Sequence, residues 1–243
     1  MFVPLHCIAL RTSKYSDRYS ILSVYTREMG RQSLLIPATS GKSASRYRAL
    51  TMPLSAFECV ATVTSGRDVH PIKDLKPDSE SLKRDYNNPR KSVVSFFLSE
   101  FFYSILKEPQ TDIPMYELIR STAEELNRSD DKATANLHLL TLVRTARVLG
   151  IEPDISTIRE EAYFDLEEGV WKKDLSSMNR NCLTGEKSRQ AMRIARMTSG
   201  NYRYYRFNRD QRNEALSYML KYFNLHGFGK TDIEAVEVLK ELF

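Results

Sequence analysis

A two-residue alternation of apolar and polar side chains predicts a β-hairpin over residues 19–36. Leu22 and Val24 fall on one face of its first strand, and Ser23 falls on the other. Gly30 supplies the positive φ that a bulged hairpin loop needs, and the strand pattern resumes after it. We take this predicted hairpin as the reference for the neighbouring strands.

Similar alternation predicts further strands over residues 6–11, 54–64 and 69–73. The last of these carries Pro71, which confines it to a sheet edge or a strand end. Five short strands at the start of a chain favour a small closed or nearly closed barrel, because closure removes exposed sheet edges.

Helical periodicity then replaces the alternation. Asn88 is a good N-cap and Pro89 a good first helical residue. Gly150 is placed to end a later helix, and Thr231 with Glu234 forms a capping box that would start the last one. The predicted helices cover residues 89–106, 112–126, 133–149, 186–198, 208–225 and a C-terminal segment from residue 231.

These elements predict a multi-domain α+β chain. A β-barrel domain covers residues 1–78, and an all-α domain covers residues 79–243. Residues 151–180 form an irregular insert in the helical domain, with a turn or hairpin around residues 163–171.

The amino-acid composition limits the class of protein but does not identify a function. Of the 243 residues, 42% are hydrophobic and 28% are charged, which is ordinary for a soluble globular protein. Cys7, Cys59 and Cys182 are scattered, which argues against a disulfide framework and a zinc ribbon. The sequence has neither an apolar run long enough to span a membrane nor the pattern of a signal peptide, so we expect a cytoplasmic protein.

The net charge of +5 is mild, so the clustering of charge is more informative. Eight Lys or Arg residues surround the predicted hairpin, against Asp17 and Glu28. These candidate DNA-binding residues are Arg11, Lys14, Arg18, Arg27, Arg31, Lys42, Arg46 and Arg48. The tyrosines interleaved with them are Tyr15, Tyr19, Tyr25 and Tyr47.

Phosphate neutralisation combined with base stacking on aromatic rings is how small barrels hold single strands. A solvated basic surface with half-buried tyrosines would give the same pattern, and charge alone does not separate the two interpretations. The loop at residues 40–48 favours the binding site, because a loop has no structural need for so much like charge.

A second basic and aromatic segment covers residues 193–212. It could extend a nucleic-acid track or receive an acidic peptide. We favour an amphipathic segment that packs its aromatic side chains inward, and we leave the role of its arginines open.

The sequence shows no catalytic constellation. The four histidines form no pairing motif, and we expect His138 and His226 to be hydrogen-bonded core residues. Glycine-rich phosphate loops and nucleophile elbows are absent from the sequence. We therefore expect no enzyme activity, no cofactor and no metal.

In order along the chain, several segments resemble the RecO family of recombination mediators. They include Tyr-Ser-Asp before the hairpin and Leu-Gly-Ile-Glu-Pro after the third helix. The matching segments are residues 8–12, 15–17, 21–30, 112–116, 135–139, 149–153, 212, 222–226 and 237–243. The resemblance covers essentially the whole chain.

This resemblance implies an N-terminal oligonucleotide-binding (OB) barrel and a helical C-terminal domain. It implies a non-catalytic, nucleoid-associated protein that binds single- and double-stranded DNA and anneals complementary strands. It also implies help in loading a recombinase onto coated single strands, with RecR and the C-terminal tail of single-stranded DNA-binding protein as partners.

The chain departs from the family at one point. Many members carry a four-cysteine zinc site after the third helix, whereas residues 155–171 contain no cysteine. For the partner tail, we suggest Arg144 and Arg147 as the residues that meet its terminal carboxylate. The alternative functions are a protein-interaction adaptor whose barrel is only a scaffold, and a small enzyme with an unrecognised site. Oligomeric state, stoichiometry with RecR and preference among single strands, duplexes and RNA stay open.

Overall fold

The computed structural model describes residues 1–38, 47, 50–78, 88–228 and 233–242. The chain divides into two compact units, residues 1–128 with 233–235 and residues 129–232 with 236–243. The first unit holds two helices besides the barrel, and the boundary after residue 78 stays a prediction.

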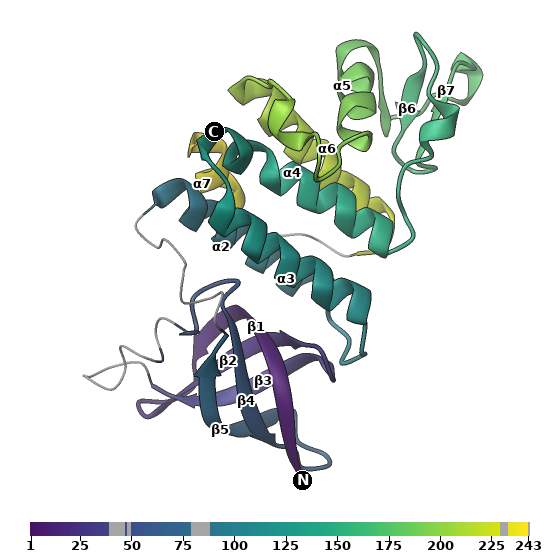
Figure 1. Cartoon of the computed structure of the whole chain (residues 1–243). Coiled ribbons are helices and arrows are strands. Elements are labelled where there is room, and N and C mark those ends of the chain that lie inside the picture. Colours follow the sequence, from purple (N-terminus) through teal and green to yellow (C-terminus); the bar gives the residue numbers. More distant parts are fainter. Residues whose placement is uncertain (39–46, 48–49, 79–87, 229–232, 243) are drawn as a thin grey trace. The chain divides into compact units, whose positions relative to one another are not determined.

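A closed barrel forms the start of the first unit (Figure 1). Its strands lie in the order β1-β2-β3-β5-β4, and the long β1 closes the barrel by pairing with both β2 and β4. This is the five-stranded arrangement of an OB fold, which confirms the predicted fold. The strands are β1 (Phe2–Lys14), β2 (Tyr19–Thr26), β3 (Gly30–Pro37), β4 (Ala56–Thr62) and β5 (Val69–Pro77).

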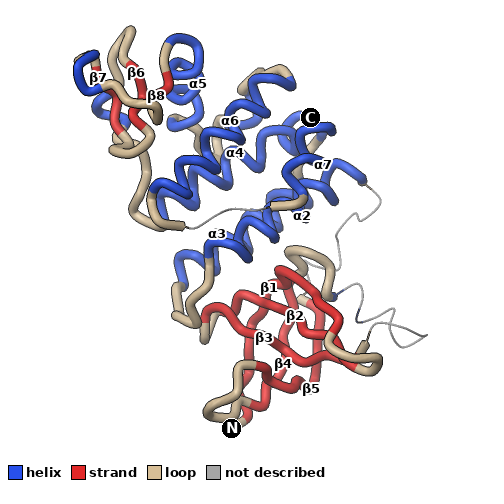
Figure 2. The backbone as a smooth tube through the Cα atoms, turned by 180° about the vertical axis from the view of Figure 1, so that it is seen from behind, coloured by secondary structure: helices blue, strands red, loops and turns tan. Residues whose placement is uncertain are grey.

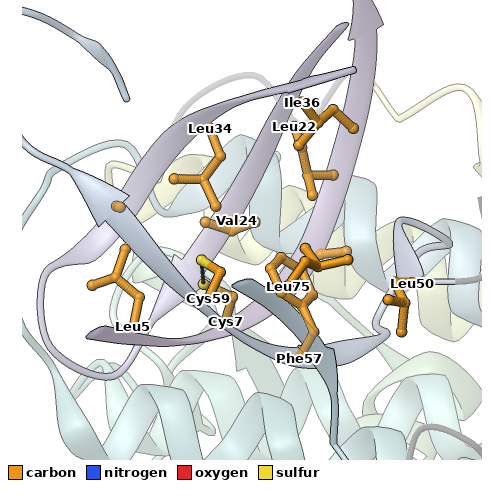
Figure 3. Close-up of a cluster of buried hydrophobic side chains, with 12 residues drawn as sticks. Leu5, Cys7, Leu22, Val24, Leu34, Ile36, Leu50, Phe57, Cys59 and Leu75 are labelled. Carbon is orange, nitrogen blue, oxygen red and sulfur yellow. Dashed lines mark hydrogen bonds between the residues drawn. The ribbon is translucent and has the colours of Figure 1, made fainter. Parts of the chain in front are cut away.

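The predicted hairpin is β2 and β3, paired from Tyr19 with Pro37 to Thr26 with Gly30. Alternate side chains of each strand point into the barrel, as Figure 3 shows for Leu22, Val24 and Leu34. All three are fully buried, and each such side chain stabilises the fold by about 1.5–3 kcal/mol. The alternation in the sequence therefore follows directly from the barrel core.

Two thiols meet inside this core. The Sγ atoms of Cys7 and Cys59 are 3.8 Å apart, and both cysteines are free (Figure 3). Burial raises the pKa of the Cys7 thiol, with the neighbouring Cys59 adding to the effect. Both residues thus behave as small apolar side chains.

Two helices complete the first unit, α2 (Pro89–Ile105) and α3 (Ile113–Arg128). The Asn88 side chain accepts hydrogen bonds from the first-turn amides of α2, which confirms the predicted N-cap. Ser95 Oγ of α2 donates to the carbonyl oxygen of Pro53 at 2.9 Å, which ties the helix to the segment before β4. Figure 2 shows both helices beside the barrel strands.

The β2–β3 turn fits against the segment between α2 and α3. Gly30 has a φ of +61°, and a Cβ atom added to it would overlap the carbonyl oxygen of Gln110. Thr111 Oγ1 donates to the carbonyl oxygen of Glu28 at 2.7 Å. Glycine is therefore required at this turn for two reasons, its backbone conformation and its missing side chain.

The second unit is mainly helical. The Asp130 side chain caps α4, Gly150 ends it with a φ of +71°, and Asn208 with Gln211 forms a capping box for α6. The last helix begins at Ala235, later than we predicted, and Thr231 of the predicted capping box lies outside the described residues. The helices are α4 (Asp131–Val148), α5 (Gly185–Ala195), α6 (Arg209–Leu225) and α7 (Ala235–Leu242). No described helix is both long and apolar enough to cross a membrane.

The predicted insert contains a small sheet in the order β7-β6-β8, which confirms the hairpin around residues 163–171. Its strands are β6 (Tyr163–Asp165), β7 (Val170–Lys172) and β8 (Cys182–Leu183). The Phe164 ring stacks on Trp171 at a centroid distance of 4.3 Å and on Tyr222 of α6 at 6.0 Å. Aromatic packing thus fixes this sheet to the helices.

We predict that Gly30→Ala lowers the free energy of unfolding by about 3 kcal/mol, because strain at positive φ adds to overlap with Gln110. The matched control is Gly66→Ala in the β4–β5 loop, where φ is +77° but nothing lies within 4 Å of the added Cβ. It should lose only about 1 kcal/mol. Urea denaturation checks both, and equal losses would contradict the tight fit at Gly30.

Candidate nucleic-acid interface

The structure describes some of the predicted DNA-binding residues and leaves out others. Lys42, Arg46 and Arg48 lie outside the described residues. Arg11 and Lys14 lie on β1, and Arg18 lies in the β1–β2 loop. The remaining two residues are Arg27, in the β2–β3 turn, and Arg31, at the start of β3.

Ser16 organises the backbone of the β1–β2 loop. Its hydroxyl oxygen accepts hydrogen bonds from the amides of Arg18 at 3.3 Å and Tyr19 at 3.1 Å. The carbonyl oxygen of Tyr19 in turn accepts the amides of Ser16 at 2.9 Å and Tyr15 at 3.2 Å. This local network gives the loop a defined shape although its residues are exposed.

The charged side chains of this loop are exposed to solvent. Lys14 Nζ lies 3.1 Å from Asp17 Oδ1, but the two side chains are 77% and 96% exposed, so the pair contributes little to stability. Arg18 is also exposed, and its carbonyl oxygen accepts the amide of Ala38 at 2.8 Å. The loop therefore lies beside the point where the chain leaves β3.

The four interleaved tyrosines divide into two pairs. Tyr15 and Tyr19 are 65% and 44% exposed. Tyr25 is buried, and burial, followed by the charge of Asp112, raises its pKa to about 12. Tyr47 is partly buried against the barrel core. Of these four tyrosines, only Tyr15 and Tyr19 are exposed.

The Arg31 side chain makes contacts within the first unit. Its Nη1 donates to the carbonyl oxygens of Tyr103 at 2.7 Å and Leu106 at 3.0 Å, at the end of α2. Its guanidinium lies 3.8 Å from the centre of the Tyr103 ring, and Arg11 approaches the same ring at 5.2 Å. A cation at a helix C-terminus is stabilised by the helix dipole, so Arg31 has a structural role within the first unit.

Arg27 lies on the exposed side of the β2–β3 turn. Its Nε is 3.9 Å from Glu117 Oε1 of α3, and both side chains are half exposed. Such a pair is weak in water, so Arg27 is accessible to a competing anion.

The two arginines suggested for the partner tail lie on α4. Arg147 Nε donates to Glu152 Oε2 at 2.6 Å, and both side chains are half exposed. Arg144 is partly buried on the same helix. A carboxylate already occupies the guanidinium of Arg147, and an incoming carboxylate would have to displace it.

The aromatic residues of the second basic segment mostly pack inward. Tyr202 and Phe207 are buried, whereas Tyr204 is 74% exposed. Asn136 of α4 holds the segment by donating to the carbonyl oxygens of Tyr202 at 3.0 Å and Tyr205 at 2.9 Å. The amphipathic interpretation therefore holds for Tyr202 and Phe207 but not for Tyr204. Its exposed arginines include Arg196, Arg203 and Arg206.

The predicted core histidines differ in their surroundings. His226 is the C-cap residue of α6, and its Nε2 lies 3.1 Å from the carbonyl oxygen of Leu166. His138 is buried in α4, where burial and the charge of Arg212 lower its pKa to about 3. Within the described ranges, no three His, Cys, Asp or Glu side chains are grouped so that they could hold a metal ion.

The fold and the basic loop define the class of protein first. The chain carries an OB-fold barrel with an exposed basic and aromatic loop, followed by a helical unit with a small sheet. Residues 1–78 match the family model described as the N-terminal part of recombination protein O.

Whole-chain relatives identify the family. The DNA repair protein RecO of Porphyromonas gingivalis (strain W83) is 31% identical over 249 residues, which cover 100% of both chains. The RecO proteins of Phocaeicola vulgatus and Christiangramia forsetii are 29% and 25% identical, over 97% and 100% of each chain respectively. The chain belongs to the RecO family of DNA repair proteins.

We predict that Arg31→Ala lowers the free energy of unfolding by about 1–2 kcal/mol, because two carbonyl oxygens at the end of α2 lose a charged donor. Arg18→Ala is the matched control and should stay within about 0.5 kcal/mol, since its side chain is exposed. Denaturant titration measures both. Identical midpoints would show that the Arg31 contacts add nothing to stability.

We also predict a pH effect from His138. Its pKa is about 3 in the fold and ordinarily 6.5, so the unfolded chain takes up the proton first as pH falls. The second unit should lose about 2 kcal/mol between pH 7 and pH 5 from this group. In His138→Gln this part of the loss should vanish, and parallel pH profiles for the two proteins would refute the assignment.

Proposed function

We propose that the chain is a non-catalytic recombination mediator that binds single- and double-stranded DNA. It promotes annealing of complementary strands and helps load a recombinase onto coated single strands during DNA repair. In this proposal its partners are RecR and the C-terminal tail of single-stranded DNA-binding protein, and it works in the cytoplasm at the nucleoid.

The β1–β2 loop carries this proposal. Lys14 and Arg18 place two cations next to the exposed rings of Tyr15 and Tyr19. Cations that neutralise phosphates and rings that stack on bases are the two components of single-strand binding by OB folds. Membership of a family of DNA repair proteins supports the same function.

The site that we propose has a core and an extension. The core is the loop with Lys14 and Arg18, and Arg27 contributes a further accessible cation. Lys42, Arg46 and Arg48, which lie outside the described residues, are the proposed extension because their charges cluster in the sequence. Arg11 and Arg31 are less available to phosphate, since both guanidinium groups approach the Tyr103 ring.

We predict that replacing Lys42, Arg46 and Arg48 together with Gln weakens binding to unrelated sequences equally. If each residue contacts a phosphate, the slope of log K against log salt for single strands should fall by about 2. Fluorescence anisotropy of a labelled oligonucleotide at several salt concentrations measures this slope.

The matched control removes the same charge from exposed residues of the second unit, Lys132, Lys173 and Arg180, and should keep the wild-type slope. An unchanged slope in the first variant would remove residues 42–48 from the site. No binding of the wild-type protein at low salt would refute DNA binding by the chain on its own.

The second candidate function is a protein-interaction adaptor whose helical unit docks partner peptides. Arg144 and Arg147 on α4 favour this alternative, because both could meet an acidic tail. Reversing the charges of the barrel would then leave peptide binding and repair intact. Charge reversal of Lys14 and Arg18, with repair in cells as the readout, separates the two functions, because loss of repair supports the mediator and intact repair supports the adaptor.

A further inference from the structure

We propose that Tyr15 and Tyr19 make the β1–β2 loop selective for single-stranded nucleic acid, by stacking on two unpaired bases. This inference rests on the proposed DNA-binding function and adds to it the class of ligand and the residues that choose it. Lys14 and Arg18 hold the phosphates in this arrangement, and the rings hold the bases.

The exposure of the two rings is the first observation. Tyr15 is 65% exposed and Tyr19 is 44% exposed, whereas Tyr25, further along β2, is 2% exposed. Within the described residues, neither exposed ring stacks on an aromatic ring or a guanidinium group. Two apolar ring faces are therefore open to a flat ligand.

The fixed backbone beneath the rings is the second observation. The Ser16 hydroxyl and the Tyr19 carbonyl oxygen together accept four backbone amides within this one loop. The rings are carried by a preformed turn, so a ligand has little backbone entropy to remove when it binds. A tyrosine side chain itself loses only two torsions on stacking.

The order of the side chains is the third observation. A cation precedes each ring, Lys14 before Tyr15 and Arg18 before Tyr19. The carbonyl oxygen of Tyr19 also accepts the Tyr15 amide at 3.2 Å, so the two ends of the turn are adjacent. The loop thus repeats a phosphate contact and a stacking surface, which matches the repeat of a single strand.

A duplex cannot use both parts of this site. Its bases are stacked on one another inside the helix, so their faces are closed and only phosphates meet the loop. The cations therefore serve both kinds of DNA, and the rings add affinity for unpaired bases alone.

The test compares a single strand with the duplex of the same sequence, by anisotropy at fixed salt. Tyr15→Ser and Tyr19→Ser should each weaken single-strand binding about fivefold or more, and leave duplex binding within about twofold. Tyr15→Phe and Tyr19→Phe keep the stacking surface and should restore wild-type binding. Thermal unfolding verifies that each variant is folded.

A second readout reports stacking directly. The chain has one tryptophan, Trp171, which is 4% exposed and gives a constant background. In Tyr15→Trp, the new indole should be quenched by the single strand and not by the duplex. Quenching of equal size by both would overturn the selectivity.

The outcomes separate this inference from the proposed function. If the serine variants lose equal affinity for single strand and duplex, or lose none for either, the role of the rings is overturned. Salt-dependent DNA binding by the wild-type protein would still support the proposed function. Absence of wild-type binding to both forms of DNA overturns the proposed function itself. Reduced single-strand binding alone, restored by phenylalanine, supports the inference.

Discussion

The contact between the β2–β3 turn and the end of α2 is the interaction on which the first unit depends. Barrel closure fixes the position of Arg31, the second residue of β3. The end of α2 supplies carbonyl oxygens that have no hydrogen-bond partner within the helix. One guanidinium satisfies two of these oxygens and also covers the Tyr103 ring. The fit at Gly30 excludes other residues from the same place. The barrel and its two helices are therefore coupled through a small number of atoms.

Much of this fold follows from local rules in the sequence. Alternation located the β2–β3 hairpin because one face of each strand fills the barrel, and Asn88 located a helix start because its side chain accepts the first amides. The start of α7 was predicted too early, since the described helix begins at Ala235, and Thr231 of the predicted capping box lies outside the described residues. Arg209 of α6 donates to the carbonyl oxygen of Lys240, and no local sequence pattern predicts this contact.

The candidate site was less predictable than the fold. Charge clustering found Lys14 and Arg18, but it gave the same weight to Arg31, whose partners lie more than 70 residues away in the sequence. The four tyrosines look alike in the sequence, and only the barrel decides that Tyr25 is inside while Tyr15 is outside. One local signal was available, because a serine within a four-residue turn typically accepts backbone amides, as Ser16 does.

The burial of the barrel thiols has a practical consequence for labelling. Cys7 and Cys59 face each other in the core, and the raised pKa of Cys7 keeps its reactive thiolate scarce. Cys182 on β8 is partly exposed in the second unit. A thiol-reactive dye will therefore attach to one position of the native chain without any cysteine being replaced. That single attachment point would allow fluorescence studies of the helical unit in the unmodified sequence.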